Sequence, residues 1–164
     1  MFRRLGRNLS DLTGHARIPV TPVPAGSAPP SFARAGTARV ICVTSGKGGT
    51  GKSVLTSNLA TELALRGRRV LAVDVDLGLA NLHLLLGLTP RKSLYHSLLS
   101  NLTFREVSER TASGVTLVPG PSGVAELADL STRDLAHLIS ETARFGAEFD
   151  VVLVDTAAGI SRMT

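Results

Sequence analysis

The stretch that decides the fold is Ser45-Gly46-Lys47-Gly48-Gly49-Thr50-Gly51-Lys52-Ser53. It follows the apolar run Val40–Val43 and precedes a segment with helical character, so it lies between a predicted strand and a predicted helix. The spacing of one glycine, four residues and Gly-Lys-Ser fits the P-loop pattern. In a chain of this length, average residue usage produces that match by chance well under about one time in a hundred. We therefore interpret the stretch as a phosphate-binding loop rather than an incidental glycine-rich turn.

Each residue type in this loop has a chemical reason. Glycines let successive backbone N–H groups turn inward toward phosphate oxygens, Lys52 brings a positive charge, and the Ser53 hydroxyl can ligate Mg²⁺. A helix beginning at Ser53 adds the positive end of its dipole. Lys47 is a second lysine in the loop, although the chain has only three lysines. The predicted nucleotide-binding residues are Gly46, Lys47, Gly48, Gly49, Thr50, Gly51, Lys52 and Ser53.

The 164 residues predict one folded domain, at 39–164, preceded by a basic tail at 1–38. Residues 1–39 contain six arginines and one aspartate, whereas residues 40–164 contain twelve basic and twelve acidic side chains. The sequence pI of 10.3 therefore comes from the tail. It does not predict a DNA-binding domain, and we expect no direct sequence-specific contact with nucleic acid.

Two parts of the tail differ in pattern. Apolar residues recur at helical spacing in residues 1–12, beside arginines, which is compatible with a short amphipathic helix on an anionic membrane or a partner. A frayed tail with accidental periodicity is the alternative, because a twelve-residue helix is marginal alone. Residues 18–38 contain five prolines and predict an extended linker.

Composition excludes several classes of protein. No apolar run approaches eighteen residues, so the sequence predicts no transmembrane span. The single cysteine, Cys42, lies in the first predicted buried strand and excludes an internal disulfide. One thiol is also too few for a four-cysteine iron–sulfur site, and this usage suits the reducing cytoplasm.

Predicted strands and helices alternate along the domain, which is typical of an α/β fold with a parallel sheet, right-handed crossovers and helices on both faces. About four strands are predicted, at Val40–Thr44, Val70–Val73, Val115–Val118 and Phe149–Val154. Helical segments are predicted at Ser53–Arg66, Asn81–Leu86, Ser93–Leu99, Thr103–Arg110 and Thr132–Arg144, with a further apolar segment at Val124–Leu130. Capping boxes mark the starts of two helices, at Thr103 and Ser131.

Three carboxylates follow predicted strands. Asp155 comes directly after Val151–Val154, where P-loop proteins place the aspartate that holds Mg²⁺ directly or through water. Asp74 and Asp76 come at the end of another predicted strand, two positions apart. One can then support the water shell of the metal while the other reaches an attacking water. The alternative for each is a solvated acidic strand end.

Four segments carry a resemblance to a known family. They are Lys47–Ser53, Asp74–Gly87, Val118–Leu127 and Asp155–Ser161. The first, with its extra lysine, resembles the deviant Walker A motif of the MinD/ParA P-loop ATPases. The other three resemble, within that superfamily, the MinD-like regulators of flagellar number, the FlhG/FleN group. The similarity runs from about Arg39 to Ser161.

The resemblance implies a role for each site residue. Lys47 would be the signature lysine that reaches the partner's nucleotide in an ATP-bound dimer, and Lys52 would bind the β- and γ-phosphates. Asp76 would orient the attacking water, so Lys47, Lys52 and Asp76 are the expected catalytic residues. Ser53, Asp74 and Asp155 are the expected metal-associated residues, and Gly159 would belong to a switch that senses the γ-phosphate.

The resemblance also implies cofactors, partners and location. The cofactors would be ATP and Mg²⁺, with hydrolysis coupled to a cycle between ATP-bound homodimers at the membrane and cytoplasmic monomers. The expected location is cytoplasmic, with peripheral contact to the inner face of the cell membrane. The flagellar group would meet a signal-recognition-type GTPase, a transcription activator and motor-switch proteins.

The sequence also departs from the family. It ends at Thr164, so we expect only the amino-terminal part of the family fold, without the later strands that supply the adenine pocket and without the C-terminal membrane-targeting helix. The first strand would then keep an unpaired apolar edge. His83 stands where an aspartate is usual, and the Asp-Gln-Ala activator motif of the flagellar group does not occur.

Several functions remain open at this point. Septum placement and plasmid or chromosome partitioning are alternatives within the superfamily. A truncated, non-hydrolysing module that binds a nucleotide or a partner is an alternative of another class. A guanine-specific GTPase is less favoured, because no Asn-Lys-x-Asp base-reading motif occurs, although the residues alone do not decide between adenine and guanine.

Overall fold

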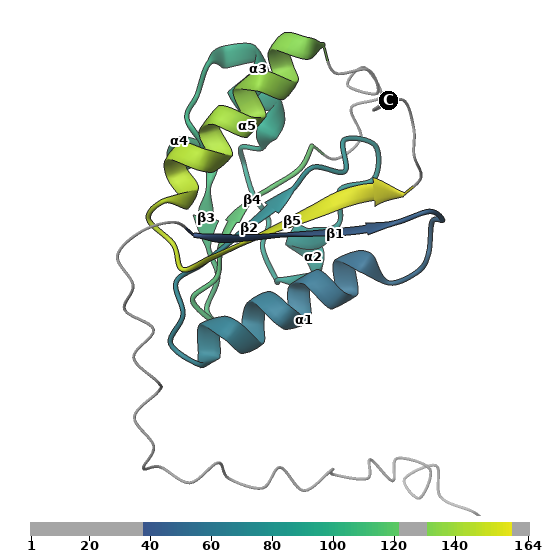
Figure 1. Ribbon diagram of the computed structural model, residues 1–164, viewed down its shortest axis with the longest axis vertical. Coiled ribbons are helices and arrows are strands. Elements are labelled where there is room, and N and C mark those ends of the chain that lie inside the picture. The colour runs from purple at the N-terminus through teal and green to yellow at the C-terminus, as the bar shows by residue number, and fades with distance from the viewer. Residues whose placement is uncertain (1–37, 122–130, 159–164) are drawn as a thin grey trace, which may run out of the picture. The chain divides into compact units, whose positions relative to one another are not determined.

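The computed structural model describes residues 38–121 and 131–158 (Figure 1). Its strands are β1 (Arg39–Ser45), β2 (Val70–Asp74), β3 (Glu109–Arg110), β4 (Thr116–Val118) and β5 (Val151–Ala158). Its helices are α1 (Lys52–Leu65), α2 (Leu82–Leu85), α3 (Leu94–Ser100), α4 (Phe104–Val107) and α5 (Thr132–Gly146). The predicted tail helix at 1–12, the segment Val124–Leu130 and the predicted switch residue Gly159 lie outside the described residues.

The strands form one sheet in the order β1-β5-β2-β4-β3. Strands β1, β5, β2 and β4 are parallel, and only the two-residue β3 runs antiparallel, against β4. The parallel sheet predicted from the sequence is thus confirmed, with one short added strand. Because parallel strands end at the same edge, the carboxyl ends of β1, β5 and β2 meet there.

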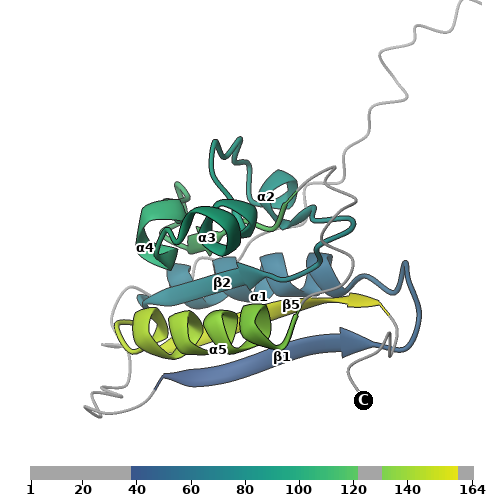
Figure 2. The same cartoon turned by 90° about the horizontal axis from the view of Figure 1, so that it is seen from above.

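Helices cover both faces of the sheet. Figure 1 shows α1 and α2 on one face and α3, α4 and α5 on the other. From above, α5 lies beside the α3–α4 pair (Figure 2). Strand β2 lies at the centre and its five residues are all buried. Val70 and Ala72 pack toward α1, whereas Leu71 and Val73 pack toward α5, as the alternation of a strand requires.

Helix α5 keeps the capping box predicted for it. The Ser131 side chain accepts from the Asp134 N–H, and the Asp134 carboxylate accepts from the Ser131 N–H at 3.0 Å. The helix runs through Gly146, two residues beyond the predicted end. In the described ranges, 38–121 and 131–158, no helix is long and apolar enough to cross a membrane.

Helix α4 is shorter than the predicted Thr103–Arg110. Its capping box is confirmed, because the Thr103 N–H donates to Glu106 Oε2 at 2.7 Å, but the helix ends at Val107. Glu109 and Arg110 instead form β3, which pairs with β4. The turn between β3 and β4 contains Gly114, which has φ +92°. The prediction was wrong here because pairing with a neighbouring strand outweighed the local helical pattern.

Strand β1 forms an edge of the sheet, with β5 as its only neighbour among residues 38–121 and 131–158. Val40 is 56% exposed. Cys42 is exposed too, which corrects the prediction that it lies in a buried strand. A strand at an edge has one covered side fewer than a central strand, and an apolar sequence does not distinguish the two positions.

The loop after β4 approaches β2 closely at Gly120. A Cβ atom at this position would lie 2.7 Å from Ala80 Cβ, 2.8 Å from the Asp74 carbonyl oxygen and 3.1 Å from Asp74 Cγ. Two of these contacts are shorter than packed proteins tolerate. The absence of a side chain at Gly120 therefore lets this loop close over the end of β2.

We expect Gly120→Ala to lower the free energy of unfolding by about 1–3 kcal/mol, because the added methyl group must displace backbone at the end of β2. Urea unfolding of the purified chain measures this. Gly46→Ala is the matched control, since a Cβ there meets no atom within 4 Å. Equal urea midpoints for the two variants would contradict the close approach.

Candidate phosphate-binding site

The glycine-rich loop connects the carboxyl end of β1 to the first turn of α1. Gly49 has φ +72° and Gly51 has φ +85°, a region of backbone conformation that residues with a side chain rarely adopt. Gly51 is also the N-cap of α1, which begins at Lys52, one residue earlier than predicted. The two glycines therefore set the turn that directs the chain from the sheet into the helix.

The loop is also closed by hydrogen bonds between its own residues. The Lys52 ammonium donates to Ser45 Oγ at 3.2 Å, and Thr50 Oγ1 donates to the same oxygen at 2.9 Å. Ser45 was not among the predicted site residues, because the P-loop spacing pattern begins at Gly46. The Lys47 residue is exposed.

Asp155 lies beside the start of α1. It pairs in register with Val43 of β1 and with Asp74 of β2, and it is only 1% exposed. Thr56 Oγ1 of α1 donates to Asp155 Oδ1 at 3.3 Å. Burial raises the pKa of the Asp155 carboxyl, while hydrogen bonding from Ser53 and Thr56 lowers it, as does the charge of Lys52. The fold thus brings Lys52, Ser53 and Asp155 together.

Asp74 is completely buried, and its carboxylate accepts hydrogen bonds from two backbone N–H groups. Its Oδ1 accepts from the Asp76 N–H and its Oδ2 from the Leu82 N–H, both at 3.1 Å. Burial raises the pKa of Asp74 to about 7, although both backbone hydrogen bonds act in the opposite direction. The carboxylate therefore ties the beginning and end of the 75–82 segment to the end of β2.

Asp76 lies beyond the end of β2, in this same segment. Its Oδ1 accepts from the Gly78 N–H at 3.2 Å and from the Leu79 N–H at 3.0 Å, and the residue is half-buried. The charge of Asp76 contributes to the raised pKa values of both Asp74 and Asp155, although burial is the larger cause for each. The three predicted carboxylates are therefore electrostatic neighbours.

The donor set fits Mg²⁺ held together with phosphates. Within residues 38–121 and 131–158, no three His, Cys, Asp or Glu side chains gather closely enough to hold a metal ion by themselves. Mg²⁺ characteristically takes one or two protein carboxylates and fills its remaining positions with substrate phosphates and water. Ser53 and Asp155 supply protein oxygens beside the loop, and no atom would obstruct a Cβ at Gly46, Gly49 or Gly51.

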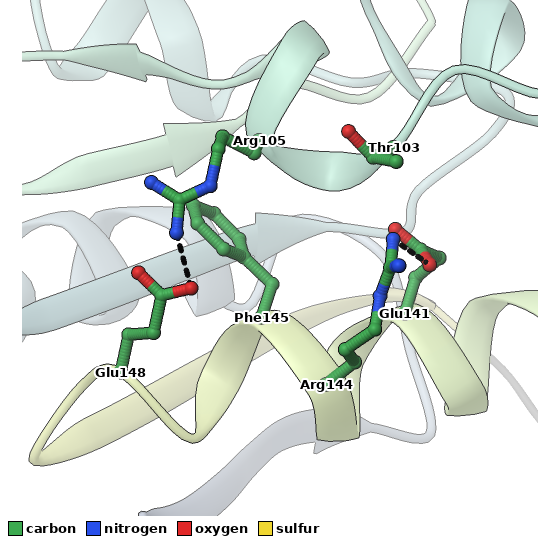
Figure 3. Close-up of a pocket in the computed structure, with 6 residues that line it drawn as sticks. All are labelled: Thr103, Arg105, Glu141, Arg144, Phe145 and Glu148. Atoms are coloured by element: carbon green, nitrogen blue, oxygen red, sulfur yellow. Dashed lines mark hydrogen bonds and ion pairs between the residues drawn. The ribbon is translucent and has the colours of Figure 1, made fainter.

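A hollow lies between α4 and α5, with a volume of about 260 Å³ (Figure 3). Its charged groups are already paired, Arg105 with Glu148 and Arg144 with Glu141, and the Arg105 guanidinium lies 5.2 Å from the centre of the Phe145 ring. Figures 1 and 2 place α4 at the end of the sheet opposite the carboxyl ends of β1 and β5. We therefore assign the candidate site to the glycine-rich loop and not to this hollow.

The strand, glycine-rich loop and helix, with a buried aspartate on the neighbouring strand, define a P-loop protein of the α/β class. Residues 41–163 match the family described as the CobQ/CobB/MinD/ParA nucleotide binding domain. This chain belongs to that family of P-loop ATPases.

Similar proteins include an antiactivator and a flagellum site-determining protein. The antiactivator FleN of Pseudomonas aeruginosa is 45% identical over 122 residues, covering 74% of this chain and 44% of FleN. The flagellum site-determining protein YlxH of Helicobacter pylori is 35% identical over 133 residues, covering 81% of this chain and 45% of YlxH. The chain thus spans less than half the length of these two relatives.

The fold is similar to solved MinD structures. The septum site-determining protein MinD of Pyrococcus horikoshii, in complex with Mg-ADP, superposes with a TM-score of 0.63 at 31% identity, covering 76% of this chain and 51% of that chain. The predicted α/β fold of MinD-like type is therefore confirmed.

The pKa of Asp74 predicts a pH dependence of stability. Its folded-state value of about 7 lies above the ordinary value of 3.8, so between these pH values the folded state binds more protons than the unfolded state. Stability therefore falls as pH rises from 4 to 7, by as much as about 4 kcal/mol from this group. We expect Asp74→Asn to lose that part of the dependence.

Urea unfolding in EDTA at pH 4, 5, 6 and 7 measures this difference without bound metal. Asp150→Asn is the control, because Arg69 holds the pKa of that carboxyl below its ordinary value, so the midpoint of its titration lies below pH 4. The prediction is contradicted if the stability difference between the wild type and Asp74→Asn is constant from pH 4 to pH 7.

Proposed function

We propose that this chain binds ATP with Mg²⁺ at the Gly46–Ser53 loop and hydrolyses it, as part of a MinD-like regulator of flagellar number or placement. The observation that supports this best is the meeting of Lys52, Ser53 and buried Asp155 at one end of the sheet. Membership of the nucleotide-binding family and the Mg-ADP complex of a similar MinD protein support the same ligand.

The residues have separate tasks in this proposal. The loop N–H groups and the Lys52 ammonium bind the phosphates, while Ser53 and Asp155 hold the metal or its water shell. When bound, Mg²⁺ neutralises phosphate charge. Asp74 assists by fixing the segment that carries Asp76, whose carboxylate orients the attacking water. Catalysis is then positioning and charge stabilisation, without a covalent enzyme intermediate.

Lys47 acts between two copies of the chain in this proposal. It is exposed and sits within the loop, so its ammonium can extend away from its own site. We propose that Lys47 reaches the nucleotide of a second copy in an ATP-bound homodimer. Nucleotide state would then control dimerisation.

The name of the similar flagellum site-determining protein YlxH supports a flagellar role. We propose a cytoplasmic protein with peripheral contact to the inner face of the cell membrane. Its partners would be a signal-recognition-type GTPase of flagellar assembly, a transcription activator and motor-switch proteins. These partners are proposed for the whole protein. This chain spans less than half the length of the two similar proteins.

Lys52→Ala tests the enzymatic proposal. We expect release of phosphate from MgATP to fall at least about 100-fold, because the variant lacks the charge that binds and stabilises the transferred phosphoryl group. Lys92→Ala is the matched control, since Lys92 donates to the Glu106 carbonyl oxygen at 3.4 Å, outside the loop. Size-exclusion chromatography establishes that each variant is folded.

The outcomes separate the candidate functions. Turnover in the wild type and Lys92→Ala that disappears in Lys52→Ala supports a self-sufficient ATPase. Folded wild-type protein that binds MgATP without turnover favours a non-hydrolysing nucleotide-binding module. Folded protein that neither binds nor hydrolyses MgATP would contradict the proposal.

A further inference from the structure

Ser45 connects the two ends of the glycine-rich loop through a single hydroxyl group. Its Oγ donates to the Lys47 carbonyl oxygen at 2.8 Å, and it accepts from Thr50 Oγ1 at 2.9 Å and from Lys52 Nζ at 3.2 Å. All three partners belong to the loop or to the first residue of α1. The same oxygen thus contacts residues two, five and seven positions further along the chain.

These three hydrogen bonds use the full capacity of the group. A serine hydroxyl has one hydrogen to donate and two lone pairs with which to accept. The hydroxyl hydrogen is donated to the Lys47 carbonyl oxygen, and the two lone pairs accept from Thr50 Oγ1 and Lys52 Nζ. Neither alanine nor any residue without a hydroxyl can make the same set of contacts.

The position of Ser45 is itself held by the sheet. The pairing of β1 with β5 shifts between Val43 and Ser45, so that Ser45 pairs with Ala158 beyond an irregularity. Thr156 Oγ1 on β5 donates to the Val43 carbonyl oxygen at 3.0 Å, at the start of this irregularity. Ser45 therefore occupies the last paired position of β1, and the pairing of β1 with β5 fixes where the loop begins.

Each contact has a consequence for phosphate binding. The bond to the Lys47 carbonyl fixes the backbone from which the exposed Lys47 side chain extends. The bond from Lys52 occupies one of three ammonium donors and leaves two for phosphate oxygens. Both effects organise the loop before a ligand arrives, which reduces the ordering cost of binding.

We propose that the Ser45 hydroxyl is a positioning group that pre-organises the phosphate loop and both of its lysines. This inference rests on the proposed function where nucleotide affinity is concerned. The three hydrogen bonds of Ser45 form in the protein without nucleotide, so their effect on the loop is measured separately.

The first measurement is tryptic cleavage of the Lys47–Gly48 bond in the full chain without nucleotide. The scissile carbonyl accepts from Ser45 Oγ at 2.8 Å, and more weakly from Thr50 Oγ1 at 3.4 Å. We expect Ser45→Ala to accelerate this cleavage about fivefold, relative to cleavage after Arg110 in the same digest, and Ser45→Thr to restore the wild-type rate. Ser108→Ala is the matched control, because it deletes a hydroxyl that donates to the Arg105 carbonyl at 3.0 Å, away from the loop.

The second measurement is the affinity for a fluorescent ADP analogue with Mg²⁺. We expect about tenfold weaker binding for Ser45→Ala, with affinity recovered in Ser45→Thr and unchanged in Ser108→Ala. Thermal unfolding establishes that Ser45→Ala remains as stable as Ser108→Ala. A general loss of structure would weaken binding in proportion to unfolding and would not be rescued by threonine.

The outcomes distinguish this inference from the proposed function. If the wild type binds no nucleotide while Ser45→Ala still accelerates cleavage at Lys47, the proposed function fails and the role of Ser45 in closing the loop stands. If Ser45→Ala matches the wild type in cleavage, or if Ser45→Thr behaves as Ser45→Ala in both measurements, the inference is overturned.

Discussion

The candidate site depends on the insertion of β5 between β1 and β2. In the paired register, β1 and β2 precede β5 by 112 and 81 positions along the chain, and parallel pairing on both sides places Asp155 level with Val43 and Asp74. That insertion places the Asp155 carboxylate beside Lys52 and Ser53 of the glycine-rich loop. The buried side chains of β2 and β5 stabilise the arrangement through the hydrophobic effect, since Val152 packs toward α5 and Leu153 toward α1.

At this edge of the sheet, some interactions favour neutral carboxyl groups and others favour charged carboxylates. Three carboxylates lie near one another, and burial is the largest cause of the raised pKa values of Asp74 and Asp155. Backbone N–H groups, two hydroxyls and Lys52 oppose that effect. A site built this way is costly to keep charged in the absence of a cation and is well suited to one, which agrees with the ligand chemistry of P-loop proteins.

Sequence reasoning predicted the parts of the fold that local chemistry determines. The loop followed from glycine spacing, the α/β architecture from alternating strands and helices, and the helix starts from the Thr103 and Ser131 capping boxes. Strand order could not be predicted this way, because long-range pairing leaves no local signal. The exposure of Cys42 and the early end of α4 depend on that order. The hydrogen bonds of Ser45 and Asp74 likewise require knowledge of which backbone atoms the fold brings near them.

Recognition of nucleotide phosphates by the loop underlies every role proposed for the site. Competition against a fluorescent MgADP analogue bound to the full chain tests it most directly, with inorganic pyrophosphate and adenosine as competitors. We expect pyrophosphate to displace the analogue and adenosine at the same concentration not to displace it, since Lys52 and the loop N–H groups bind the phosphates. Displacement by adenosine but not by pyrophosphate would contradict it, as would folded protein that fails to bind the MgADP analogue at all.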